Sequence, residues 1–148
     1  DAAILAEYNA AMAAETEGKT LDPAIVGPGV SALLADRSMG RYWVAEVDGR
    51  VIGQLMVTYE WSDWRNGTIW WIQSVYVHPD WRRKGVFSAL YHHVESLAAA
   101  APGVIGLRLY VDADNSRAQQ TYAALGMVIS DYRVMETLFG TSSTSEEN

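Results

Sequence analysis

A run of positive charge at residues 82–85 is the part of this sequence whose chemistry is easiest to interpret. Arg82, Arg83 and Lys84 are consecutive and are followed by Gly85. They stand where an apolar pattern predicts the start of a helix, and a helix N-terminus already carries partial positive charge. Three cations are unfavourable there unless an anion binds to them and to the free backbone N–H groups. The run therefore predicts an anion site, or else a solvated charge cluster in front of an amphipathic helix.

The rest of the chain is acidic, which makes this run a local exception. The 148 residues include 11 Lys and Arg against 18 Asp and Glu, for a formal net charge of -7. Such a surface repels polyanions, so we expect neither nucleic acid nor a membrane as a partner. The absence of cysteine excludes a Cys nucleophile, thiolate metal sites and disulfides, and we expect no metal. The sequence also contains no phosphate-binding P-loop and no G-x-S-x-G motif.

Hydrophobic periodicity predicts one mixed α/β domain over residues 1–139, with its elements in the order ααβββαβαβ. Residues 140–148 are only Gly, Thr, Ser, Glu and Asn, so we expect a disordered tail there. No apolar run approaches the ~20 residues of a membrane span, and no signal peptide is visible. We therefore expect a cytoplasmic protein.

The predicted elements would bring the positive run to the start of a central helix. A right-handed parallel crossover is expected where a strand, this helix and a second strand follow one another. Two N-terminal helices, the second opened by Pro23, are expected before the first strand. The predicted strands are residues 42–47, 51–60, 68–77, 104–111 and 127–137, with a hairpin at Asp48-Gly49, and the later helices are residues 87–98 and a helix that ends at Gly126.

Two segments resemble motifs of the GNAT superfamily of N-acetyltransferases. Residues 75–90 read VYVHPDWRRKGVFSAL and are similar to its acetyl-CoA signature, whose Q/R-x-x-G-x-G/A core falls on residues 82–87. Residues 115–118, NSRA, and 122–127, YAALGM, resemble its second motif. The resemblance covers residues 1–136. It implies a mostly antiparallel sheet with one splayed parallel pair, and transfer of an acetyl group from acetyl-CoA.

The resemblance also implies which residues bind the cofactor. The backbone of residues 75–77 is expected to bond the pantetheine arm, and residues 82–88 to hold the pyrophosphate. Phe87 stands where the family motif has Gly or Ala. The family's first strand has no counterpart before Asp1, so it is either truncated or supplied by another chain. The expected cofactor residues are Val75, Tyr76, Val77, Arg82, Arg83, Lys84, Gly85, Val86, Phe87, Ser88 and Asn115.

Tyr122 matches the position of the family's general acid. A phenol of pKa ~10 can return a proton to a thiolate whose thiol has a pKa of ~8.5. The alternative is a core aromatic between Ala118 and Leu125. The general base is open, because residues 71–74 read WIQS where many family members carry Glu. Glu60 is the first candidate for the base, and its alternative is a solvent-facing carboxylate at a strand end.

Acidic and aromatic residues predict the acceptor site. Glu15 and Glu17 lie between the first two helices, and four of the six tryptophans fall within residues 61–71. Carboxylates and aromatic rings suit a cationic amine through charge and cation–π contact. Trp70 and Trp71 are adjacent on a strand, so one must point to the core and the other away. We take Glu15, Glu17, Trp61, Trp64 and Trp71 as the expected acceptor residues.

The sequence thus predicts an acetyltransferase that moves an acetyl group to a primary amine by direct attack in a ternary complex. A small cationic amine is the expected acceptor. Acetylation of a peptide or protein N-terminus or lysine stays open, as does a CoA-binding module without turnover. The resemblance to the family also suggests a homodimer.

Overall fold

The fold is built on a four-stranded sheet with the order β1-β2-β3-β4. The computed structural model describes residues 1–140, which divide into one unit of residues 1–110 and a second that begins at Val111. The helices are α1 (Ala2–Glu17), α2 (Pro23–Ala35), the 3-10 helix η1 (Pro79–Trp81), α3 (Val86–Ala100) and α4 (Ser116–Ala124), and the strands are β1 (Gly40–Val47), β2 (Arg50–Ser62), β3 (Gly67–Val77) and β4 (Val104–Leu109).

Strands β1, β2 and β3 form the predicted antiparallel meander, and β4 pairs with β3 in parallel. The hairpin between β1 and β2 turns at Asp48 and Gly49, whose φ angles are 51° and 76°. Positive φ at both central residues is what a two-residue turn of the I′ type requires, and Asp and Gly tolerate it. The sequence therefore predicted both the sheet's mixed character and its first turn.

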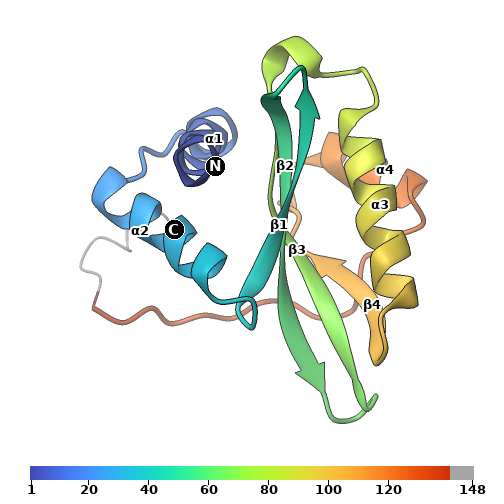
Figure 1. The fold of residues 1–148 in the computed structure, drawn as a ribbon. Coiled ribbons are helices and arrows are strands. Elements are labelled where there is room, and N and C mark those ends of the chain that lie inside the picture. The colour runs from blue at the N-terminus through green and yellow to red at the C-terminus, as the bar shows by residue number, and fades with distance from the viewer. Residues whose placement is uncertain (141–148) are drawn as a thin grey trace. The chain divides into compact units, whose positions relative to one another are not determined.

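The helices of the first unit cover both faces of this sheet. Figure 1 shows α1 and α2 on one side and α3 on the other. On the α1 side, the Tyr8 ring lies 5.0 Å from the Tyr76 ring, and its hydroxyl donates to the Val51 carbonyl over 2.6 Å. Helix α3 buries an apolar stripe with a period of three to four residues, as amphipathic helices do. The buried residues of that stripe are Leu90, Tyr91, Val94 and Ala98.

Strand β3 extends beyond the end of its pairing with the parallel strand β4. The pairing of β3 with β4 runs from Thr68 opposite Val104 to Ile72 opposite Leu109, and β3 continues to Val77. Within residues 1–140 the last part of β3 thus has no strand on its β4 side. This is the splayed parallel pair that the resemblance to the GNAT superfamily implies.

A β-bulge lies at the point where β3 leaves β4. Gln54 pairs with Tyr76 and Met56 pairs with Gln73, so two steps along β2 correspond to three along β3. Ser74, inside the bulge, has a φ of 52°. The left-handed region is uncommon for a residue with a side chain. Something beyond the β-ladder must therefore hold this conformation.

The expected final strand over residues 127–137 is wrong. No strand is assigned between α4 and residue 140, and large apolar side chains of this segment are 57% to 95% exposed. β-branched and aromatic residues favour strands only when a neighbouring strand completes the ladder, and no described residue does so here. The exposed side chains are Val128, Ile129, Tyr132, Val134, Met135, Leu138 and Phe139.

Two further expectations concern the extent of the chain. Residues 141–148 of the expected tail lie outside the described residues, and one domain over residues 1–139 stays a prediction. Across residues 1–140, no helix has the length and apolar character needed to cross a membrane.

Candidate active site

The loop between β3 and α3 presents the positive run at a helix N-terminus. Arg83 and Gly85 have φ angles of 62° and 82°, which turn the chain sharply before α3. Gly85 occupies the N-cap position and has no side chain to cap the helix, and a Cβ on it would meet no heavy atom within 4 Å. The first backbone N–H groups of a helix have no intrahelical partner. The open space in front of α3 therefore suits an anion, and the anion site stays a prediction.

Two cations of the run, Arg83 and Lys84, have exposed side chains. Lys84 is exposed, and its Nζ lies 5.2 Å from the centre of the Trp81 ring, a cation–π contact. Arg83 is also exposed and stands beside it. Val86 and Ser88 belong to the first turn of α3, and Phe87 packs its ring 6.1 Å from that of Tyr91. Together these residues could hold a diphosphate.

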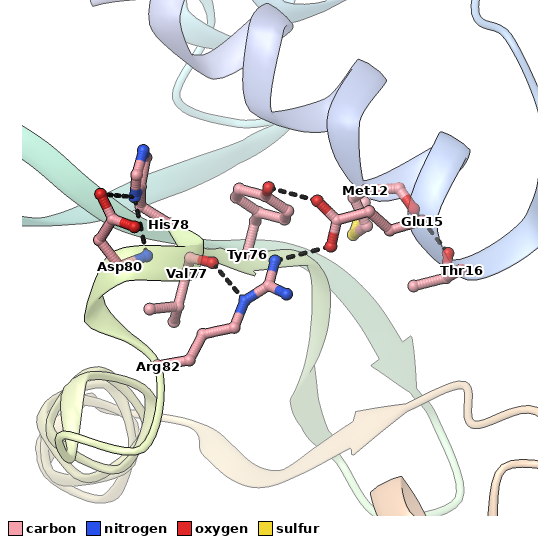
Figure 2. Close-up of polar contacts among 8 residues, drawn as sticks. All are labelled: Met12, Glu15, Thr16, Tyr76, Val77, His78, Asp80 and Arg82. Atoms are coloured by element: carbon pink, nitrogen blue, oxygen red, sulfur yellow. Dashed lines mark hydrogen bonds and ion pairs between the residues drawn. The ribbon is translucent and has the colours of Figure 1, made fainter.

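The exposed Arg82 side chain points toward the end of β3 and helix α1. Its Nε donates to the Val77 carbonyl oxygen over 2.9 Å, and its Nη2 lies 2.7 Å from Glu15 Oε1 on helix α1 (Figure 2). The guanidinium carbon lies 5.3 Å from the centre of the Tyr76 ring. Arg82 therefore ties the loop to the end of β3 and to α1.

Glu15 joins two residues that the sequence placed in the cofactor site. It accepts a second hydrogen bond, over 2.7 Å, from the Tyr76 hydroxyl (Figure 2). Burial, together with this hydrogen bond, raises the pKa of Tyr76 to about 12. The hydrogen bonds from Tyr76 and Arg82 lower the pKa of Glu15 below its ordinary 4.5. We refer to Glu15, Tyr76 and Arg82 as the carboxylate cluster.

Replacing Glu15 by glutamine is expected to reduce stability in a pH-dependent manner. The folded pKa of Glu15 lies below its unfolded value, so its contribution is present above pH 4.5 and is lost as the pH falls through the folded pKa. Both partners of the ion pair are more than a third exposed, so we expect a loss of only about 0.5–1 kcal/mol at pH 7. Urea unfolding at pH 7 and at pH 3 measures it, and the difference from wild type should shrink at pH 3.

The matched control is Glu17→Gln. Glu17 lies on the same helix, and its carboxylate pairs only with the exposed Lys19 over 3.2 Å in the described part of the chain. We expect that variant to unfold at the wild-type urea concentration at both pH values. Equal losses in the two variants would contradict a specific role for the carboxylate cluster.

Glu60 has two donors on one oxygen. Its Oε1 accepts from Trp71 Nε1 over 2.6 Å and from Arg108 Nη1 over 3.1 Å. The hydrogen bond from Trp71 lowers the pKa of Glu60, and the hydrogen bond and charge of Arg108 act in the same direction against partial desolvation. A lowered pKa makes Glu60 a weaker base than an ordinary carboxylate. The geometry favours a carboxylate that stays charged over one that exchanges protons near neutral pH.

The four tryptophans do not form one wall. Trp70 is 7% exposed and stacks at 5.9 Å on Trp43, while the ring of Trp71 lies 4.6 Å from that of the exposed Tyr110 at a tilt of 38°. Trp71 pairs with Thr58 across β2 and β3, and Trp61 lies three residues further along β2, which puts it on the opposite face. Trp61 is 61% exposed and Trp64, in the turn after β2, is 90% exposed. Only Trp71 of the expected set lies beside Glu60.

The second unit contains the expected general acid. Asn115 is the N-cap of α4, and its Oδ1 accepts from the Ala118 N–H over 3.0 Å. This leaves its side-chain amide group as a donor. Tyr122 lies two turns further along α4 and is half-buried, and burial raises its pKa above 10.0. The phenol is therefore protonated throughout the neutral range, as a general acid must be.

Sequence reasoning missed several polar residues near the β-bulge and near the point where β3 and β4 separate. Gln54, Asn9 and Arg108 are polar or charged residues inside runs that otherwise read as apolar strand or helix. That interruption was the available signal for all three. Tyr110 carried no signal, because one exposed tyrosine after a strand is common.

Known proteins are similar to this chain in sequence and in fold. The model of the Acetyltransferase (GNAT) family matches residues 7–127. A possible acetyltransferase from Clostridium difficile 630 has a solved structure that is 44% identical, with a TM-score of 0.89, covering 93% of this chain and 91% of that one. No curated protein matches the sequence.

More distant structures share the fold. An integron cassette protein from the mobile metagenome of Cole Harbour Salt Marsh is 20% identical with a TM-score of 0.81, over 95% of this chain and 86% of that one. The ribosomal-protein-alanine N-acetyltransferase from Brucella melitensis biovar Abortus 2308 is 21% identical with a TM-score of 0.69, over 91% and 92%. The family match over residues 7–127 and the 44% identity agree with the basic loop, the bulge and the split sheet, and on this evidence the chain belongs to the GNAT family of acetyltransferases.

Proposed function

We propose that this acetyltransferase moves an acetyl group from acetyl-CoA to the nitrogen of a small cationic amine, by direct attack within a ternary complex. The observation that carries the proposal is the uncapped N-terminus of α3 behind a basic loop, beside a β3 edge that β4 has left. Such a site offers backbone and side-chain donors to a diphosphate and a free strand edge to an extended amide-containing arm. Coenzyme A has both groups, and its thioester supplies the activated acetyl group.

Each predicted cofactor residue has a role in this proposal. The N–H groups at Gly85, Val86 and Ser88 and the charges of Arg83 and Lys84 bind the diphosphate. Arg82 acts indirectly, since it holds the loop against β3 and α1. The backbone of residues 75–77, together with Phe87 and Asn115, completes the predicted set.

Tyr122 supplies the acid for the proposed transfer. The amine nitrogen attacks the thioester carbon, so a C–N bond forms and the C–S bond breaks. The amine must first lose one proton to solvent water, because an alkylamine of pKa ~10.4 is almost wholly protonated at pH 7, and its nitrogen loses a second proton to water as the amide forms. Tyr122 donates its phenolic proton to the departing sulfur. No cysteine is available to carry the acyl group, which favours direct transfer.

The acceptor side is proposed to use charge and aromatic surface. Glu15, Glu17 and Glu60 are carboxylates in the first unit, and the net charge of -7 favours a cation over an anion. The Trp71 ring bonds Glu60 and contacts the exposed Tyr110 ring, which presents aromatic surface to solvent. Trp61 and Trp64 are exposed elsewhere, and as acceptor residues they stay predictions. A cytoplasmic location also stays a prediction.

Thiol release from acetyl-CoA over a panel of polyamines, aminoglycosides, amino acids and short peptides tests the proposal. We expect release with one class of small amines and little with peptides. Release only with peptides would favour acetylation of a protein N-terminus or lysine. Binding of CoA by calorimetry without thiol release for any acceptor would favour a binding module without turnover.

Replacing Glu60 by glutamine is expected to weaken acceptor binding more than catalysis. Because the lowered pKa makes Glu60 a poor base, we expect the KM for the amine to rise about 5–10-fold, which is ~1 kcal/mol of lost attraction, with kcat changed less than threefold. Steady-state rates at saturating acetyl-CoA separate the two constants. A fall in kcat of about 100-fold with an unchanged KM would instead assign Glu60 as the general base.

We also propose that the chain forms a homodimer. The support is the exposed apolar segment 127–139 together with the sheet edge at β4, on which no further strand lies among residues 1–140. A second copy carries the complement of each feature, and symmetric pairing would cover both. Sedimentation at micromolar concentration measures this, and a monomer would contradict it.

A further inference from the structure

The bulge in β3 depends on a buried amide that the family motifs do not include. The Gln54 side chain is 0% exposed, and its Nε2 donates to the Ser74 carbonyl oxygen over 2.9 Å. Ser74 is the residue with positive φ inside the bulge. A bulge takes one residue out of the β-ladder, so its backbone groups need other partners. Gln54 supplies that partner from the neighbouring strand.

The same amide group connects the bulge to helix α1 and strand β1. The second hydrogen bond of Gln54 Nε2 goes to Asn9 Oδ1 over 2.9 Å. Asn9 Nδ2 in turn donates to the Tyr42 hydroxyl over 3.2 Å. Asn9 is also buried, so water does not compete for these bonds. The carbonyl of Ser74 is thereby fixed relative to two other elements.

Stability alone does not account for a glutamine at this position. Its Oε1 is buried and has no hydrogen-bond partner among residues 1–140. Burying an acceptor without a partner is unfavourable. The register partners of Gln54 on the two neighbouring strands are Val44 and Tyr76, and both belong to the apolar packing on the α1 face, so an apolar side chain would fit beside them. What only the amide provides is the donor pair that holds Ser74 and Asn9.

The bulge immediately follows the last pairing of β3 with β4, at Ile72 and Leu109. The backbone of Val75 and Tyr76 therefore takes its direction from the bulge, just where the sheet opens. We propose that Gln54 is a positioning residue for acetyl transfer: it holds the Ser74 carbonyl and so aims the backbone of residues 75–76 at the reacting group. The inference rests on the proposed function, because it takes the open β3 edge as the place where the thioester arm lies.

The main test is Gln54→Met, which removes the donors and keeps an unbranched side chain of similar length. We expect kcat to fall on the order of 10–100-fold, as misplacement of reacting groups does, while the melting temperature and the Kd for CoA stay near wild type. Adding Ser74→Gly to this variant should restore part of kcat, because glycine adopts positive φ without a Cβ penalty. Recovery of this kind is not expected from a role in packing alone.

Asn9→Leu is the matched control. It removes the link to α1 and leaves the bond from Gln54 to Ser74 possible, so we expect a lower melting temperature with kcat within about threefold of wild type. A Gln54→Met variant with wild-type kcat would overturn the inference. Equal losses of kcat in Gln54→Met and Asn9→Leu would also overturn it, since they would indicate general packing.

Backbone NMR separates this inference from the proposed function. In the wild-type protein, the amide resonances of Val75 and Tyr76 should shift when CoA is added, and Gln54→Met should move the same resonances in the free protein. If the wild type transfers acetyl to no amine, the proposed acceptor fails, and the resonances still decide the inference. Unmoved resonances at residues 74–76 in Gln54→Met would overturn it.

Discussion

Tyr122→Phe is expected to lower kcat about 100-fold or more while the Kd for CoA stays within about twofold of wild type. The substitution removes only the phenolic oxygen and its proton, and leaves the ring of a half-buried side chain in place. Without the proton, the sulfur must leave as a thiolate. Initial rates of thiol release at saturating acetyl-CoA and amine give kcat, and calorimetry with CoA gives the Kd.

The pKa of Tyr122 sets the pH dependence of this comparison. Burial raises that pKa above 10.0, so the wild-type phenol keeps its proton at every pH up to about 10. The ratio of wild-type to variant kcat should therefore be constant between pH 6 and about 9, because only deprotonation of Tyr122 would reduce it. Tyr132→Phe is the control, since Tyr132 is exposed and lies in the same unit. Unchanged turnover in Tyr122→Phe at saturating cofactor would remove Tyr122 from the mechanism.

Gly85→Val is expected to weaken CoA binding on the order of 100-fold, through the loss of about two hydrogen bonds to a charged group. The φ of Gly85 is 82°, which a β-branched residue adopts only with strain, and its side chain would enter the open space before α3. Both effects oppose a diphosphate at the helix N-terminus. Titration of the purified variant with CoA measures the change.

Gly18→Val separates the strain of the backbone from the effect of a side chain in the space before α3. Gly18 has a φ of 64°, and a Cβ there would also meet no heavy atom within 4 Å, but it ends helix α1 instead of preceding α3. We expect both variants to lose about 1–2 kcal/mol of stability from the strained backbone. Only Gly85→Val should lose CoA affinity. Equal affinities in the two variants would show that the diphosphate lies elsewhere.

The sequence predicted the elements that its own periodicity determines. The helix start at Pro23, the turn at Asp48 and Gly49 and the buried stripe of α3 are local patterns, and all three are confirmed. Their physical causes are a capping residue, a turn that needs positive φ, and a 3.6-residue period. None depends on a distant part of the chain.

The strand prediction that failed and the contacts that were missed all depend on residues far apart in the sequence. Residues 127–137 have the composition of a strand, but composition does not provide a neighbouring strand. The bulge at Ser74 leaves no trace in sequence, because serine is not a residue that requires positive φ. Glu60 was recognisable as a carboxylate near tryptophans, whereas its bond to Arg108 crosses 48 positions of sequence. Charge state follows from such contacts and so could not be predicted.

The contact between Lys84 and Trp81 would make a diphosphate bound at the basic loop detectable by fluorescence. An ammonium group 5.2 Å from an indole ring alters the emission of that fluorophore, and a bound diphosphate would draw the ammonium away from it. Five other tryptophans also emit, and Trp64→Phe would remove the contribution of the most exposed one, which is 90% exposed. In such a variant, we expect intrinsic fluorescence to follow occupancy of the loop in real time without an added label.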